Sequence, residues 1–333
     1  MRERGHVVEA GGEVWGGGLP PSSLPERGVP TSEIDGRSVL WLRRLIGRFR
    51  PDVVHAHWMP FAALAALAGA RPLVATAWGS DVYGAGFKHR MLIRLALRRS
   101  SVAMTDSTDL MARLEELGPS SLQTMVVNWG VDLETFAPPS EQKRAELKAR
   151  FGLGPGPVVL SPRGLKALYN PDVVMEAFGQ VLTAIPSAQL VLKHGGGAEE
   201  VKGEWANAPG VKVIGRIEYA DMADLFRAAD LTVSIPTTDS SPRSVWEAMA
   251  AGSATVLSDL PWVHELIESE RDALVVAPGA QSVAHAIERL IHDDALRERV
   301  VRSARQLVET HRDRTKELAR VERCYLELIR SEK

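Results

Sequence analysis

Residues 229–258, ADLTVSIPTTDSSPRSVWEAMAAGSATVLS, carry the pattern that decides the fold. The apolar run at 229–235 predicts a buried strand, a loop follows at 236–242, and the run at 253–258 predicts the next strand. Between them, Ser241 is a candidate N-cap and Pro242 fits the first helical position, where a missing N–H costs nothing. This order predicts a parallel sheet whose loop lies at the carboxyl end of a strand, where open α/β sheets bind ligands.

The predicted helix start carries the groups of a phosphate and sugar site. Free amides of Arg243, Ser244 and Val245, together with the positive end of the helix dipole, favour phosphate. Asp239 in the loop and Glu247 inside the helix can accept hydrogen bonds from sugar hydroxyls. Phosphate beside a polyol indicates a nucleotide sugar. An ordinary capped helix is the alternative interpretation, and the flanking strands favour the site.

The composition indicates a globular protein of two domains. Its 333 residues are 45% hydrophobic and 25% charged, with a formal net charge of −2, which argues against a nucleic-acid-binding protein. The single cysteine, Cys324, excludes an internal disulfide and suits a reducing compartment. No apolar run reaches the roughly 20 residues of a membrane span and the N-terminus lacks a signal-peptide core, so we expect a cytoplasmic location.

Short apolar strands alternate with helices along the chain, which predicts two Rossmann-like parallel-sheet domains facing a cleft. The expected strands are 53–57, 73–77, 102–105 and 125–127 in the first half, and 158–161, 189–193, 211–214, 231–235, 254–257 and 273–276 in the second. Glycine and proline are dense at 152–157, which predicts a hinge. We therefore place a first domain at 1–152 and a second, nucleotide-sugar-binding domain at 153–315.

The segment around Asp239 and Glu247 resembles the retaining glycosyltransferases of family 4. Their motif is Glu, seven residues, Glu and then Ala-Met-Ala, and here seven residues separate Asp239 from Glu247, with Ala-Met-Ala at 248–250. The resemblance implies the GT-B fold, contact of Asp239 with the donor sugar, and contact of Glu247 with the ribose. It covers about residues 4–330, most clearly 158–280, and implies that a helix at 316–333 crosses back to the first domain.

Two cations follow the first strand of the second domain. Arg163 and Lys166 could clamp a diphosphate, although solvated cations are an equal alternative from the residues alone. The resemblance implies that they neutralise the leaving pyrophosphate. The family's lysine would fall at Tyr169 here, and Lys166 is its expected substitute.

Other candidate donor residues lie at the ends of the next two strands. Gly195 and Gly196 would let the backbone approach a ligand, and a plain turn explains them equally well. Arg216 and Ile217 follow a further strand, where the resemblance implies nucleobase contacts. The full donor-binding prediction is Glu247, Ser241, Arg243, Ser244, Val245, Gly195, Gly196, Arg216 and Ile217.

The predicted acceptor side lies in the first domain and comprises His57, Trp78, Gly79 and Asp81. Residues 75–81 resemble the family's Thr-x-His-Gly-x-Asp strand end, with Trp78 in place of the histidine. Either His57 or Asp81 could then partly replace that histidine. We expect His55 and His57 to point to opposite faces of a strand, so that they form no metal pair. Residues 4–8 resemble the family's second strand, which implies that the first strand of the N-terminal domain is missing.

Two basic amphipathic segments, 37–50 and 87–99, lie in the first domain. The first holds five arginines and no acid, interleaved with apolar residues at helical spacing. Such segments could contact the inner membrane surface as a peripheral protein. The alternative is that their apolar faces pack on the sheet and their cations are solvated.

The sequence therefore predicts a glycosyltransferase that moves a sugar from a nucleotide-diphosphate sugar to an acceptor hydroxyl, with retention and without a metal. Asp239, Arg163 and Lys166 are the expected catalytic group. No cofactor is expected beyond the UDP- or GDP-linked donor, and the acceptor is a glycan, a lipid-linked sugar or a small molecule. The alternatives are a catalytically impaired nucleotide-sugar-binding or partner subunit and, below it, a nucleotide-sugar epimerase or phosphorylase.

Overall fold

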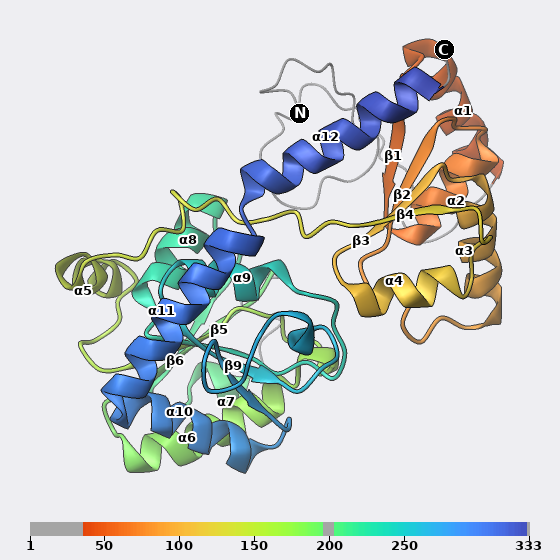
Figure 1. Ribbon diagram of the computed structural model, residues 1–333. Helices are drawn as coiled ribbons and strands as arrows, with labels where there is room; N and C mark the ends of the chain where they lie inside the picture. Colours follow the sequence, from red (N-terminus) through yellow and green to blue (C-terminus); the bar gives the residue numbers. More distant parts are fainter. Residues whose placement is uncertain (1–35, 196–202, 332–333) are drawn as a thin grey trace. The chain divides into compact units, whose positions relative to one another are not determined.

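The structure is a computed structural model, and it describes residues 36–195 and 203–331. The chain divides into two compact units, one made of Met1–Trp129 with Lys316–Lys333 and the other of Gly130–Thr315. Each unit contains a parallel sheet with helices packed on it, which confirms the predicted pair of α/β domains (Figure 1). The first strand predicted to be missing would fall outside the described residues, as does Gly196.

Within the described residues, the first unit is built on a parallel sheet in the order β1-β2-β3-β4. Alternate side chains enter different cores, because Leu73 and Ala75 pack with α2, α3 and α4 whereas Val74 packs with Val321 and Leu328 of α12. The strands are β1 (Val54–His57), β2 (Leu73–Thr76), β3 (Val102–Thr105) and β4 (Gln123–Val126). The helices are α1 (Gly36–Phe49), α2 (Met59–Leu67), α3 (Phe87–Arg99), α4 (Thr108–Glu115) and α12 (Arg314–Ser331).

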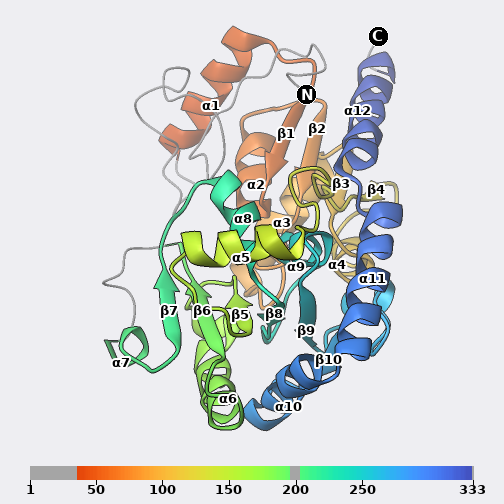
Figure 2. The ribbon, with the colours of Figure 1, turned by 90° about the vertical axis from the view of Figure 1, so that its left-hand side faces the viewer.

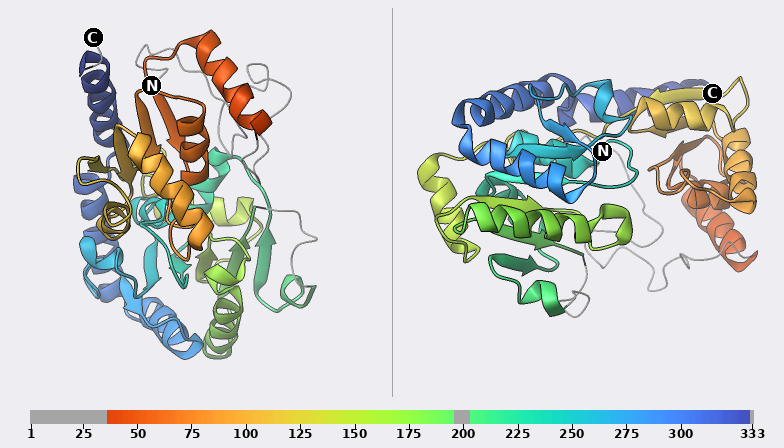
Figure 3. Two further views of the ribbon diagram at one scale, coloured as in Figure 1. Left: turned by 90° about the vertical axis from the view of Figure 1, so that its right-hand side faces the viewer. Right: turned by 90° about the horizontal axis from the view of Figure 1, so that it is seen from below.

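The second unit holds a parallel sheet in the order β10-β9-β8-β5-β6-β7 (Figures 2 and 3). Its strands are β5 (Val158–Ser161), β6 (Gln189–Lys193), β7 (Val211–Ile214), β8 (Leu231–Ser234), β9 (Ala254–Ser258) and β10 (Leu274–Val276). Its helices are α5 (Glu141–Arg150), α6 (Pro171–Ala184), α7 (Gly203–Ala206), α8 (Tyr219–Ala228), α9 (Arg243–Ala250), α10 (Ala280–His292) and α11 (Asp294–His311), with short 3-10 turns η3 (Ala167–Tyr169) and η5 (Val263–Glu265). One core lies between the sheet, α6 and α10, and another between the sheet, α8 and α9.

The strand order of the second unit reverses between β5 and β8. From β5 the chain proceeds to β6 and β7 on one side of the sheet, and it then returns to β8, β9 and β10 on the other. In open α/β sheets the loops after the two strands diverge at such a reversal, and ligands bind at the carboxyl edge there. These are the loops that carry Arg163 and Asp239.

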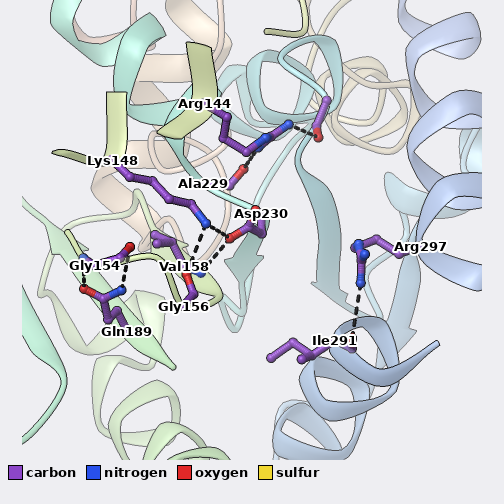
Figure 4. A network of polar contacts seen from close by, with 11 residues as sticks. Arg144, Lys148, Gly154, Gly156, Val158, Gln189, Ala229, Asp230, Ile291 and Arg297 are labelled. Carbon is purple, nitrogen blue, oxygen red and sulfur yellow. Dashed lines mark hydrogen bonds and ion pairs between the residues drawn. The ribbon is translucent and has the colours of Figure 1, made fainter. Parts of the chain in front are cut away.

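The division between the units differs from the predicted boundary at 152, because α5 belongs to the second unit. Lys148 on α5 forms an ion pair of 2.6 Å with Asp230 and donates to the Gly156 carbonyl at 3.1 Å (Figure 4). Arg144 donates to the carbonyls of Ala229 and Gly252. These contacts attach α5 to residues far away in the sequence, which the sequence pattern does not reveal. The glycines and prolines at 152–157 indicate only a local break in secondary structure. The segment Lys316–Lys333 lies in the first unit, the arrangement that the predicted crossing describes.

None of the helices in the described ranges is long and apolar enough to cross a membrane.

Candidate functional site

The reversal point of the second sheet brings Arg163 and Asp239 together. Arg163 follows β5, Asp239 follows β8, and Arg163 Nη2 lies 2.6 Å from Asp239 Oδ2, with both side chains largely buried. Arg163 also donates to Ser244 Oγ at 3.2 Å, and its guanidinium lies 4.6 Å from the centre of the Tyr169 ring. Burial raises the pKa of Asp239, and the Arg163 charge opposes that rise. The predicted diphosphate cation is thus held against the predicted donor-sugar acid.

Helix α9 begins at Arg243, and its cap differs from the predicted one. Pro242 occupies the N-cap position with extended backbone, and no side chain caps the helix there. Ser241 lies before the cap at φ 52°, and its Oγ accepts a bond of 3.0 Å from Trp246 Nε1. The N-cap prediction for Ser241 is therefore wrong, because the buried indole N–H takes the hydroxyl that would have capped the helix.

The amides at the start of α9 are only partly as predicted. The Val245 N–H donates to the Pro242 carbonyl at 3.0 Å, so it is not free. No described residue accepts from the N–H groups of Arg243 and Ser244. Two amides at the positive end of a helix, beside Arg163, form a site that favours an anion.

Glu247 lies one turn inside α9, is only 7% exposed, and is contacted by two side chains. Arg243 Nε lies 2.8 Å from Glu247 Oε1, and the Tyr219 hydroxyl donates to the same oxygen at 3.2 Å. Arg243 Nη2 also donates to the Tyr219 hydroxyl oxygen, and the guanidinium lies 5.2 Å from the Tyr219 ring centre. Burial raises the pKa of Glu247, while the Arg243 charge and the Tyr219 bond lower it.

The remaining donor-side residues surround the same edge without joining this network. Lys166 is exposed after β5, Gly195 follows β6, and Arg216 is exposed after β7. Ile217, next in sequence, packs against the core beneath α8 and α9. Two buried polar atoms at the edge, Ser240 Oγ and Arg163 Nε, have no hydrogen-bond partner among the described residues, so they are available to a ligand or to water.

Sequence reasoning missed two aromatic residues of this site, Tyr219 and Tyr169. Each lies against an arginine, Tyr219 against Arg243 and Tyr169 against Arg163. Each tyrosine comes two or three residues after a strand-end segment, Tyr219 after 215–217 and Tyr169 after 163–166, but one tyrosine at such a place is a weak signal by itself.

In the first unit, aromatic rings gather around His57 at the carboxyl edge of β1. The His57 ring stacks on His55 with 4.2 Å between ring centres and on Trp78 with 5.7 Å. Trp129 lies 5.1 Å from His57 and 5.7 Å from Trp78, and 37% of Trp78 is exposed. We call His57, Trp78 and Trp129 the aromatic cluster. The prediction that His55 and His57 point to opposite faces is wrong, because residues two apart on a strand share a face.

His55 is fixed inside the first unit. Its Nε2 lies 2.6 Å from Thr76 Oγ1, and its Nδ1 bonds to the Tyr325 hydroxyl on α12. Burial, followed by the neighbouring His57, lowers the pKa of His55 well below its usual range, so the ring is neutral near pH 7. Among the residues that the structure describes, no cluster of histidine, cysteine or carboxylate side chains is arranged to hold a metal ion.

Asp81, predicted on the acceptor side, is 1% exposed and points into the protein. Its Oδ2 accepts from the Met59 N–H at 2.7 Å and its Oδ1 from the Trp78 N–H at 2.9 Å. It therefore ties the start of α2 to the turn that carries Trp78 and Gly79. Gly79 adopts φ 85°, a conformation that favours glycine.

Two family models match consecutive parts of the chain. The model described as Glycosyl transferase 4-like domain matches residues 1–130, and the model described as Glycosyl transferases group 1 matches residues 143–307. The second match contains the whole of the Arg163, Asp239 and Glu247 site.

The chain is similar to several curated glycosyltransferases and to solved structures of this fold, among them the two relatives and the structure that follow. The phosphatidyl-myo-inositol mannosyltransferase of Mycobacterium tuberculosis is 26% identical over 93% of this chain and 86% of its own. The alpha-D-kanosaminyltransferase of Streptomyces kanamyceticus is 27% identical over 50% of this chain and 45% of its own, so the chain spans less than half of that relative. The structure of Anabaena Alr3699/HepE in complex with UDP-glucose has a TM-score of 0.76 at 20% identity, covering 87% of this chain and 82% of that one.

Proposed function

Because this chain belongs to the glycosyltransferases of family 4, which share the GT-B fold, we propose that it transfers a sugar from a nucleotide-diphosphate sugar to an acceptor hydroxyl, with retention of configuration and without a metal ion. The observation that carries the proposal is the carboxyl edge of β5 and β8. There the free amides of α9, the Arg163–Asp239 pair and the buried Glu247 lie on adjoining elements of one unit.

The donor would bind with its diphosphate at the start of α9. The amides of Arg243 and Ser244 would bind phosphate oxygens, and Arg163 and Lys166 would supply positive charge beside them. Glu247 would accept the ribose hydroxyls, and Asp239 would orient the donor sugar. Gly195, Arg216 and Ile217 lie on the β6 and β7 side of the edge, the side proposed for the nucleobase.

Catalysis would depend on charge at the leaving diphosphate. When the bond to the sugar breaks, negative charge builds on the diphosphate, and preorganised positive groups lower the energy of that state. The side chains of Arg163 and Lys166 and the α9 dipole would supply this stabilisation. This positive charge is the basis for proposing that no metal is needed. The departing phosphate oxygen itself would take the acceptor proton.

The acceptor would bind to the first unit at the aromatic cluster. Trp78 is partly exposed beside the His57 ring at the end of β1, where a parallel sheet presents ligand groups. Asp81 supports this surface through the Trp78 amide rather than by contacting an acceptor.

We also propose that the first unit reaches a membrane-proximal acceptor through α3. The outward face of α3 carries Phe87, 79% exposed, and Met91, 50% exposed, with Arg90, Arg94 and Arg98 beside them. Apolar side chains among cations fit an anionic lipid surface, at about 1 kcal/mol per cation near the surface.

A calorimetric titration with UDP and GDP tests the donor site. We expect one nucleotide to bind, and Glu247→Ala to weaken binding by about 1 to 3 kcal/mol, the cost of leaving hydroxyl groups unpaired. Unchanged affinity in the variant would remove Glu247 from the site. Binding without any turnover of donor in an acceptor screen would instead favour the nucleotide-sugar-binding subunit. Turnover in the presence of EDTA, with the product anomer assigned by NMR, tests metal independence and retention.

A further inference from the structure

Glu247 is held at one of its two carboxylate oxygens. Arg243 Nε and the Tyr219 hydroxyl both bond to Oε1, and no described residue bonds to Oε2. A carboxylate oxygen accepts about two hydrogen bonds, so Oε1 is filled and Oε2 retains two acceptor positions. Two positions on one oxygen suit the neighbouring hydroxyls of a ribose.

We propose that Tyr219 and Arg243 are positioning residues of the donor site, which hold Glu247 ionised and turned so that Oε2 receives the ribose. This inference rests on the proposed ribose contact of Glu247. We call Tyr219 and Arg243 the Glu247 clamp. Its two members also contact each other, since Arg243 donates to the Tyr219 hydroxyl and lies over its ring. The three side chains therefore form a closed set, in which each fixes the orientation of the other two.

The clamp is needed because burial disfavours the charged carboxylate. Burial raises the pKa of Glu247, and the groups that lower it are Arg243 and then Tyr219. Other arginines pack against α9, but they do not contribute to the pKa of Glu247. From α11, Arg305 donates to the Ala250 carbonyl at 2.8 Å and Arg312 lies 4.6 Å from the Trp246 ring centre. Among the described residues, the positive charge beside Glu247 therefore comes from Arg243.

This arrangement makes the pH dependence of nucleotide binding a readout of the clamp. The ionised carboxylate is an acceptor at all its positions, whereas protonation removes the charge and turns one position into a donor, so affinity falls as pH drops through the pKa of Glu247. Without Arg243 the pKa rises further, and the fall in affinity moves to higher pH.

The experiment is a calorimetric titration of the full chain with UDP and GDP between about pH 5.5 and 8.5, in which one unit of pKa change corresponds to tenfold in affinity. It compares the wild type with Arg243→Leu, Arg243→Lys and Tyr219→Phe. We expect Arg243→Leu to bind about tenfold more weakly near pH 7, with the gap closing at the alkaline end and widening at the acid end. Arg243→Lys restores most of the affinity, and Tyr219→Phe shows a smaller shift in the same direction.

A matched control is Arg289→Leu, which removes an ion pair of the same length, 2.8 Å to Glu270, elsewhere in the same unit. It should follow the wild-type profile. The clamp proposal is wrong if the nucleotide affinity of Arg243→Leu changes with pH in parallel with the wild type. A loss of affinity that is the same at every pH counts as such a parallel profile. If Arg243→Leu does not fold, Tyr219→Phe decides instead, and a pH profile of that variant parallel to the wild type overturns the clamp.

Glu247→Gln separates the clamp from the function on which it rests. If the folded wild type binds neither nucleotide, the proposed function fails and the clamp with it. If the wild type binds, Glu247→Gln weakens binding and Arg243→Leu keeps the wild-type pH profile, the clamp alone is wrong.

Discussion

Asp81 has the residue type of a ligand contact, but its surroundings give it a structural task. Both of its oxygens accept backbone N–H groups, from Met59 and Trp78, in a site that is almost closed to solvent. Burial raises the pKa of this carboxyl, and the two amide bonds oppose the rise. No oxygen faces outward to meet an acceptor.

We therefore expect Asp81→Ala to destabilise the first unit by about 2 to 4 kcal/mol, because it leaves two buried N–H groups unpaired. Asp81→Asn keeps one oxygen acceptor and should lose less. Urea unfolding gives the free energy of unfolding, and nucleotide affinity, a property of the second unit, should not change. If Asp81→Ala is as stable as the wild type but no longer transfers sugar to an acceptor, Asp81 contacts the acceptor and our structural interpretation is wrong.

The helix α3 has an inward and an outward face of different character. Ile93, Ala96 and Leu97 are buried, while Phe87 and Met91 are exposed on the same helix. The sequence left open whether such a segment packs on the sheet or contacts a membrane. The structure shows that α3 packs on its own unit and still presents apolar side chains to solvent.

Sedimentation with vesicles tests the outward face of α3. Arg94→Gln with Arg98→Gln should lower the bound fraction on vesicles containing anionic lipid, because each cation contributes about 1 kcal/mol near the surface. The control pair, Arg299→Gln with Arg302→Gln, removes two exposed cations from α11 in the other unit and should bind as the wild type does. Equal recovery of the wild type in the supernatant with and without anionic vesicles at low salt would exclude the contact.

The strands could be predicted from the sequence because their apolar runs are short and continuous. Strands β2, β3, β5, β8 and β9 are buried along their whole length, so composition alone marks them. The start of α9 was harder to predict, because the indole of Trp246, five positions away, captures the Ser241 hydroxyl. The contacts of Arg163 with Asp239, and of Tyr219 with Glu247, join distant segments and leave no local pattern.

Taken as a whole, the chain keeps its two proposed binding surfaces on separate sheets. The donor groups lie in Gly130–Thr315, and the aromatic cluster lies in the other unit. A bound nucleotide should therefore stabilise the unit Gly130–Thr315 before it affects the other unit. Bound ligand stabilises the folded state by RT ln(1 + [L]/Kd), about 2.7 kcal/mol at a hundredfold excess over Kd.

Hydrogen exchange with UDP or GDP checks this separation. We expect slower exchange in the loops after β5 and β8 and in α9, and no change in β2 and β3 of the first unit. Glu247→Ala, at the same nucleotide concentration, should show weaker protection. Protection confined to β2 and β3 would place the nucleotide on the wrong unit for our proposal.

Helix α12 returns to the first unit after the chain has traversed the whole of the second. Val321 and Leu328 on this helix complete a core with Val74, Val102 and Met104 of the first sheet. During synthesis on the ribosome, that core cannot form until α12 has emerged. The second unit is a continuous segment, and it emerges before α12. Although domains generally fold in the order of their synthesis, here the unit that starts first should be the last to finish.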